Sequence, residues 1–133
     1  MAPADPVPPT ERPQFAVAMR LHNEGKFYEA HEAWEEIWID KLDDQWRLFV
    51  QGLIQVTSAF HKLLVQREPR GASRLLERGL GKLDQYPPDY LGIALGAFRE
   101  GARRSVAAMA TLEPKSPEID RFDRALIPAL RHL

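Results

Sequence analysis

His31 and Glu35, which are separated by one helical turn, are the residues of this sequence best suited to carry chemistry. If a helix begins at Phe27 and turns 100° per residue, His31 lies about 40° from Phe27, in the middle of an apolar stripe. Glu35 lies at about 80°, on the border of that stripe. An imidazole and a carboxylate held together in a low-dielectric place can exchange protons with a substrate. We therefore predict that His31 and Glu35 are the catalytic pair if the protein is an enzyme.

His61 adds a third candidate metal ligand to this pair. Together, His31, Glu35 and His61 offer two imidazole nitrogens and a carboxylate oxygen, a set that suits zinc, manganese, iron or nickel. The pattern differs from a zincin protease, because Glu35 stands where the second zincin histidine would be. It also differs from a ferritin-type di-iron centre, because neither histidine has a glutamate three residues before it. The ligands therefore allow one mononuclear site for a divalent metal.

A long apolar segment, from about residue 43 to residue 66, is expected to form the opposite wall of this site. It is apolar around more than half of its circumference, which is typical of a central helix. His61 lies on its apolar side, apart from a narrow polar strip formed by Arg47, Gln51, Gln55, Ser58 and Lys62. Since polar groups that face a core need partners, we expect a ligand to contact Trp38, Gln51, Gln55 and His61.

Periodicity and chain breakers predict an all-α fold. Helices are expected over residues 13–24, 27–40, 43–66 and 70–85, and a fifth is expected from about Leu91 to about residue 112. Gly25 is placed to end the first helix, and the motif around Pro87 separates the fourth from the fifth. Sustained alternation of the strand type does not occur in the sequence. We predict a single-domain bundle of about five helices with short loops.

The two ends of the chain are expected to differ from this bundle. Residues 1–12 hold four of the eleven prolines and predict an extended arm, while residues 13–133 form the helical domain. A short C-terminal helical turn or coil is expected around residues 122–127. His22 is expected to contact the negative end of the first helix dipole, and His132 to belong to the tail.

Composition excludes several functional classes. The chain has 133 residues, of which 44% are hydrophobic and 28% charged, and it has no cysteine. Disulfides, thiolate nucleophiles and cysteine-bound metals are therefore excluded, and no apolar run is long enough to cross a membrane. Residues 1–66 carry a net charge of −4 and residues 67–133 a net charge of +3. This balance argues against nucleic-acid binding, which needs a strongly basic surface. The start of the chain does not resemble a secretory signal, so a cytoplasmic location is expected.

Two stretches of the sequence resemble a family of uncharacterised bacterial and archaeal proteins, domain of unknown function family 309. The first stretch is Gly25-Lys-Phe-Tyr-Glu-Ala-His31-Glu-Ala-Trp-Glu35-Glu-Ile-Trp38. The second is Phe49-Val-Gln51-Gly-Leu-Ile-Gln55, which continues to His61. A weaker similarity extends to Gly71-Ala72 and Leu75-Leu76. The resemblance implies an all-helical fold and a metal-binding or active-site role for the motif that His31, Glu35 and Trp38 match, but no established reaction.

The function is therefore unknown at this point, and three readings of the His31–Glu35 pair are open. In the first, the protein is a binding module for a small molecule or a protein partner, which includes a homodimer, with a polar pocket between the second and third helices. In the second, it is a small metal-dependent or acid–base enzyme that uses His31 and Glu35. In the third, the pair is a buried hydrogen-bonded contact that orients one helix on the other.

Overall fold

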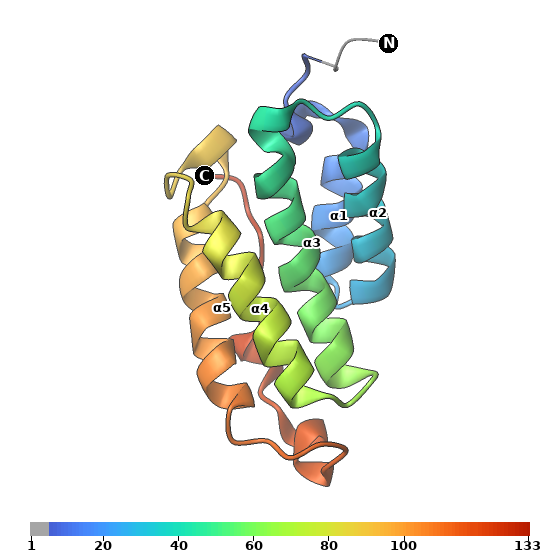
Figure 1. The fold of residues 1–133 in the computed structure, drawn as a ribbon, viewed down its shortest axis with the longest axis vertical. Helices are drawn as coiled ribbons and strands as arrows, with labels where there is room; N and C mark the ends of the chain where they lie inside the picture. The colour runs from blue at the N-terminus through green and yellow to red at the C-terminus, as the bar shows by residue number, and fades with distance from the viewer. Residues whose placement is uncertain (1–5) are drawn as a thin grey trace.

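The computed structural model describes residues 6–133, which fold into five α-helices and four short 3-10 helices (Figure 1). The α-helices are α1 (Pro13–Asn23), α2 (Phe27–Ile39), α3 (Asp44–Leu64), α4 (Pro69–Leu83) and α5 (Leu95–Met109). The 3-10 helices are η1 (Pro9–Glu11), η2 (Tyr90–Gly92), η3 (Pro117–Arg121) and η4 (Arg124–Leu126). In this part of the chain, β-structure is limited to one isolated bridge between Ile93 and His132. The all-α prediction is confirmed. None of these helices has the length and the apolar character that a bilayer crossing requires.

The long helix α3 lies at the centre of the bundle (Figure 1). Each α-helix packs against its neighbour in sequence, so that α3 has α2 on one side and α4 on the other. Helix α5 packs on the outer side of α4, while α1 packs against α2 and also contacts α3 through the Phe15–Phe49 ring pair. The core side chains of α3 are almost fully buried and include Phe49, Val50, Leu53, Val56, Phe60 and Leu63. The apolar circumference of this segment therefore predicted its central position correctly.

Glycines allow α3 and α4 to approach each other closely. A Cβ atom added to Gly79 of α4 would lie 2.9 Å from the carbonyl oxygen of Gly52 of α3. A Cβ atom added to Gly52 would lie 2.8 Å from the side chain of Leu83. Both distances are shorter than a van der Waals contact, so larger residues at either position would separate the two helices.

The turn between α1 and α2 has the geometry of a Schellman motif. The N–H of Gly25 donates to the carbonyl of His22 at 3.0 Å, and the N–H of Lys26 donates to the carbonyl of Leu21 at 2.9 Å. Gly25 has a φ of +80°, which favours glycine because a Cβ atom is strained there. Helix α1 therefore ends where the sequence predicted, and α2 begins directly after the turn.

Helix α5 begins later than the sequence predicted. Leu91 and Gly92 have φ values of 53° and 77°, so the chain leaves the helical conformation there and α5 begins at Leu95. The N–H of Ala94 donates instead to the carbonyl of Arg131 at 2.8 Å, beside the bridge between Ile93 and His132. A contact with the C-terminal segment thus overrides the local helical periodicity.

The N-terminal segment is only partly the extended arm that its prolines predicted. Within the described residues, η1 forms a 3-10 turn, and Pro9 and Arg12 are buried. Nη1 of Arg12 donates a hydrogen bond to the carbonyl oxygen of Asp40 at 2.7 Å, and this bond holds the N-terminal segment against the end of α2. The part of the arm that comprises residues 1–5 lies outside the described residues. At the other end of the chain, the expected helical turn is present as η4, preceded by η3.

Candidate functional site

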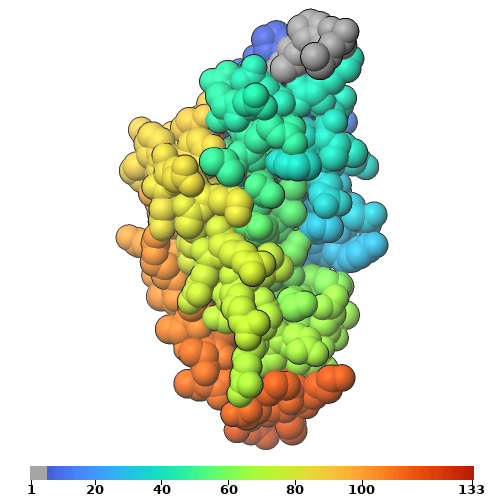
Figure 2. Space-filling model, in the orientation of Figure 1, coloured from blue at the N-terminus to red at the C-terminus, as the bar shows by residue number. Residues whose placement is uncertain are grey.

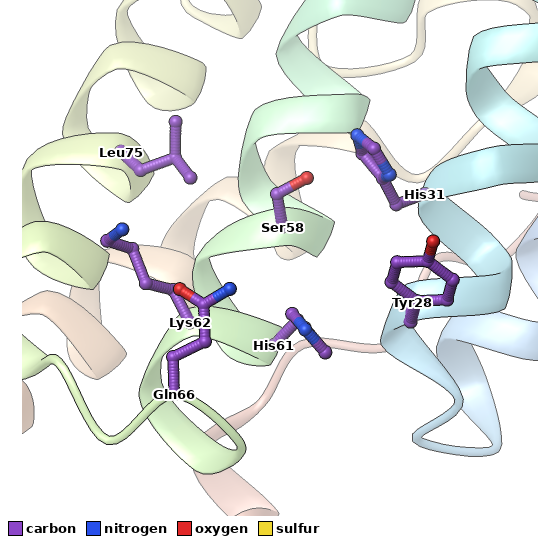
Figure 3. A pocket seen from close by; sticks show the side chains of 7 residues that line it. All are labelled: Tyr28, His31, Ser58, His61, Lys62, Gln66 and Leu75. Carbon is purple, nitrogen blue, oxygen red and sulfur yellow. The ribbon is translucent and has the colours of Figure 1, made fainter.

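A cleft of about 260 Å³ lies over α3, between α2 and α4 (Figure 3). Its lining consists of seven side chains, which are Tyr28 and His31 from α2, Ser58, His61 and Lys62 from α3, Gln66 beyond the end of α3, and Leu75 from α4. Figure 2 shows the face of the molecule on which α3 is exposed between the surfaces of α4 and α2. The cleft brings together the two histidines, His31 and His61, that the sequence singled out.

His31 lies at the edge of the buried face of α2 and not in its middle. Its side chain is 28% exposed, and that of Glu35 is 52% exposed. The most buried side chains of α2 are those of Ala30, Trp34 and Ile37. The reason is that α2 packs against α1 as well as against α3, which moves the centre of its buried arc away from His31. The prediction that His31 and Glu35 share a low-dielectric site is therefore wrong.

The His31–Glu35 contact is a local pair on one helix. Nε2 of His31 lies 3.5 Å from Oε1 of Glu35, one turn further along α2. The contact joins residues of the same helix, so it does not orient α2 on α3, as the third reading of the pair required. Glu35 is also not among the residues that line the cleft.

The donor set does not fit the divalent metal that the family resemblance implied. A structural or catalytic site for a metal such as zinc takes at least three protein ligands. Among residues 6–133, no three His, Cys, Asp or Glu side chains come close enough to one another to hold a metal ion. The predicted ligand set of His31, Glu35 and His61 is thus not assembled in this structure.

Three predicted ligand-binding residues lie outside the lining of the cleft. The indole N–H of Trp38 donates to the carbonyl of Arg47 at 3.2 Å, and the guanidinium of Arg47 lies 4.0 Å from the centre of the Trp38 ring. Oε1 of Gln55 accepts a hydrogen bond from Nζ of Lys82 at 2.9 Å. Trp38 therefore joins α2 to α3, and Gln55 joins α3 to α4. Gln51 is half-buried on α3 and does not line the cleft either.

Five of the lining residues were not predicted from the sequence as site residues, namely Tyr28, Ser58, Lys62, Gln66 and Leu75. Ser58 and Lys62 belong to the narrow polar strip of the predicted central helix. That strip was a usable signal, because a polar strip on a largely buried helix marks the side left open by its neighbours. Tyr28 is 53% exposed, and its ring centre lies 5.5 Å from that of His61.

All the polar side chains that line the cleft can donate hydrogen bonds. Lys62, Gln66, Tyr28 and Ser58 all carry N–H or O–H groups, and an imidazole has at least one N–H in every protonation state. Figure 3 shows Ser58 in the middle of the cleft, between the α2 side chains and Leu75 of α4. The Oγ atom of Ser58 is buried and has no hydrogen-bond partner. The described residues that line the cleft include no aspartate or glutamate.

A different histidine, His22, occupies the low-dielectric interior. It is 2% exposed, and although it lies in the last turn of α1 as predicted, its two ring nitrogens contact other segments of the chain. Its Nδ1 lies 3.0 Å from Oγ1 of Thr57, and its Nε2 lies 2.8 Å from the carbonyl oxygen of Pro128. Oγ1 of Thr57 also accepts the indole N–H of Trp34 at 3.0 Å. His22 follows the buried residues Phe15 and Ala18 of α1 at helical spacing, which was a signal of its burial.

The directions of these hydrogen bonds define the state of His22. Trp34 is a donor only, so the Thr57 hydroxyl accepts from it. The carbonyl of Pro128 is an acceptor only, so Nε2 of His22 carries a proton. Burial disfavours a second proton on the imidazole, so Nδ1 is an acceptor and the Thr57 hydroxyl donates its own hydrogen to it. Burial lowers the pKa of His22 to about 4, although the hydrogen bond to the Pro128 carbonyl acts in the opposite direction.

Comparison with known proteins places the cleft inside a family domain. Residues 15–75 match the family described as domain of unknown function (DUF309). This segment is a DUF309 domain. The DUF309 segment covers α1, α2, α3 and the first turns of α4, and it includes all seven residues that line the cleft. The resemblance that the sequence motifs indicated is confirmed.

The chain is also similar to a protein whose description assigns no activity. That relative is an uncharacterized protein of Aquifex aeolicus (strain VF5), which is 30% identical over 77 residues. The match spans 58% of this chain and 23% of the length of the Aquifex protein. No solved structure matches the chain.

Proposed function

We propose that this protein is a binding module that holds a small organic acid, with a carboxylate or phosphate group, in the cleft between α2, α3 and α4. The observation that carries the proposal is the convergence of donors without a carboxylate in the lining. Lys62 contributes a positive charge, and the imidazole, hydroxyl and amide groups contribute neutral donors. Hydrogen bonds from such groups to an ionised oxygen are stronger than those to a neutral oxygen.

The hydroxyl of Ser58 supports an oxygen-bearing ligand. Its Oγ atom is buried without a partner, and an unsatisfied buried polar group costs about 1–3 kcal/mol. Ser58 lies in the middle of the lining (Figure 3), and because neighbouring atoms cover its Oγ atom, an acceptor atom in the cleft would reach it after a small shift of the lining side chains. A bound carboxylate or phosphate oxygen would therefore offset a cost that the free protein carries.

The remaining surface of the cleft suits an apolar body. The side chain of Leu75 and the ring of Tyr28 lie at opposite ends of it, on α4 and α2 (Figure 3). Ligand sites usually combine an apolar lining with a few polar groups that set the orientation of the ligand. An acid with a small aromatic or aliphatic body matches this arrangement better than a bare inorganic ion.

Acid–base catalysis by His31 and Glu35, the alternative expected from the sequence, has less support. The low-dielectric environment that would make Glu35 a strong base is not formed, because its side chain is 52% exposed. The binding proposal does not depend on Glu35. We also propose a cytoplasmic location, on the compositional grounds given for the sequence.

Three probes of the same shape test the charge preference. Benzoate, benzamide and benzamidine are nearly isosteric and carry a negative, a neutral and a positive group. In NMR titrations of the isotope-labelled protein, we expect benzoate to shift the backbone amide signals of Ser58, His61 and Lys62 and to bind more tightly than the other two. Equal binding of all three, or binding away from the cleft, would contradict the proposal.

A matched pair of lysine variants tests the position of the acid. Lys62→Met keeps the methylene stem that packs over Gly71 but removes the charge, and we expect it to weaken benzoate binding about tenfold. Lys82→Met removes a charge from the neighbouring α3–α4 contact outside the cleft and should leave benzoate binding unchanged. Equal losses in the two variants would show that the effect comes from the overall charge of the protein.

A further inference from the structure

A second hollow adjoins the cleft beyond Tyr28 and His61. Its volume is about 370 Å³, and it shares these two side chains with the cleft. The rings of Tyr28 and His61 are tilted by 48° with their centres 5.5 Å apart, so they form a low divide between the two spaces. The apolar side chains of Phe27 and Leu64 contribute to the second hollow. The two spaces therefore follow one another along the same side of the bundle.

Two cations line the second hollow, Lys26 from the turn after α1 and Arg124 from η4. Glu29 is the carboxylate of this lining and opposes them. Nζ of Lys26 lies 3.5 Å from Oε2 of Glu24, but both side chains are about half exposed, so this pair contributes little. With Lys62 in the cleft, the two hollows together present three cations and one carboxylate.

Hydrogen bonds to the core hold the backbone that follows Arg124 beside the second hollow. Oγ of Ser105 in α5 donates to the carbonyl of Leu126 at 2.8 Å, and Nε2 of His22 donates to the carbonyl of Pro128. These bonds fix the segment that begins with η4 against α1 and α5. A residue far from the DUF309 segment in sequence thus lies beside its cleft.

We propose that the two hollows form one elongated site for a ligand with two separated anionic groups on an apolar linker. One group lies at Lys62 and Ser58, the other lies at Arg124 and Lys26, and the linker crosses the divide formed by Tyr28 and His61. The inference rests on the proposed function, since the first anionic subsite is the acid-binding cleft. It adds the second subsite and the ligand class, which is an organic dianion such as an α,ω-dicarboxylate.

A length series of acids tests the second subsite. Linear dicarboxylates from succinate to sebacate are compared with monocarboxylates of the same chain length by NMR titration. A ligand that occupies two subsites gains from the effective concentration of its second group, provided that its length matches the span. We expect a dicarboxylate of one length to bind at least about tenfold more tightly than its monocarboxylate partner and to shift signals on both sides of the divide.

Variants at exposed positions test which residue provides the higher affinity of the dicarboxylate. Arg124→Met is expected to reduce the affinity ratio of the best dicarboxylate to its monocarboxylate to about one, and Arg121→Met is the control. Arg121 belongs to η3 and lines neither hollow, so its replacement should leave the ratio unchanged. Dispersed NMR spectra of both variants verify that they are folded.

The outcomes separate this inference from the proposed function. If monocarboxylates bind in the cleft but no dicarboxylate binds more tightly, the second subsite is refuted while the proposed function stands. If neither class of acid binds, both proposals are refuted. If dicarboxylates gain affinity and Arg124→Met keeps that gain, the second anionic group does not lie in this hollow and the inference is refuted.

Discussion

Replacing Thr57 with valine is expected to destabilise the protein strongly, although the two side chains have nearly the same shape. The hydroxyl of Thr57 joins three elements, because it accepts from Trp34 of α2 and donates to His22 of α1. All three side chains are at most 2% exposed. Thr57→Val leaves both the indole N–H and the Nδ1 atom without a partner and without access to water.

The size of the effect follows from these two groups. Each unsatisfied buried group costs about 1–3 kcal/mol, and the added methyl group returns about 1 kcal/mol of apolar burial. We therefore expect a loss of about 3 kcal/mol, against a total free energy of unfolding of about 5–15 kcal/mol for a domain. For a chain of this size, such a loss lowers the Tm by roughly 10 °C.

Urea unfolding followed by tryptophan fluorescence measures this loss. The matched control is Thr111→Val in the exposed turn that follows α5, where the hydroxyl donates to the carbonyl of Ala108 at 3.3 Å, and we expect a change within about 0.5 kcal/mol. Thr57→Ser retains the hydroxyl and should lose less than Thr57→Val. A Thr57→Val protein as stable as the wild type, with an unchanged m value, would refute the hydrogen-bond directions assigned to His22.

Two further predictions concern pH and the helix contact. Because the pKa of His22 is lowered to about 4, the unfolded chain binds a proton between pH 6.5 and 4 that the folded chain excludes. The free energy of unfolding therefore keeps its full value above about pH 6.5 and falls by about 3 kcal/mol as the pH decreases to 4. Urea unfolding at several pH values should show a smaller fall for His22→Gln. Gly79→Ala should destabilise the protein by about 1–3 kcal/mol, because its Cβ atom would meet the carbonyl of Gly52. Gly81→Ala, on the open face of α4, should stabilise the protein by about 0.5–1 kcal/mol. Equal effects of the two glycine variants in urea unfolding would refute the close contact between Gly79 of α4 and Gly52 of α3.

Periodicity and chain breakers were sufficient for most of the fold. The apolar circumference of α3, the glycine after α1 and the aspartate before α3 act within a few residues of the elements they shape. Asp43, for example, caps α3 by accepting the N–H of Gln45 at 3.1 Å. The start of α5 was misplaced because residues 92–94 pair with the C-terminal segment, a contact between residues far apart in sequence.

The candidate site was likewise predicted only in part from the sequence. The motif around His31 pointed to the correct helix and, with His61, to two of the seven lining residues. A helical wheel assumes one buried face, but α2 has neighbours on two sides, so the wheel placed Glu35 too far inward and took Trp38 for a ligand contact. The burial of His22 was also missed, because its hydrogen-bond partners come from α3 and the C-terminal segment.

The sequence by itself determined the helices, their order and the family, because hydrophobic period, capping and motif spacing are local properties of the chain. The tertiary structure alone decided which polar groups are buried, since burial depends on how many helices surround a side chain. His22 and His31 show the difference. Both lie on amphipathic helices, yet α2, α3, α5 and the C-terminal segment together enclose the first, and the gap between α2 and α4 leaves the second at the edge of a cleft.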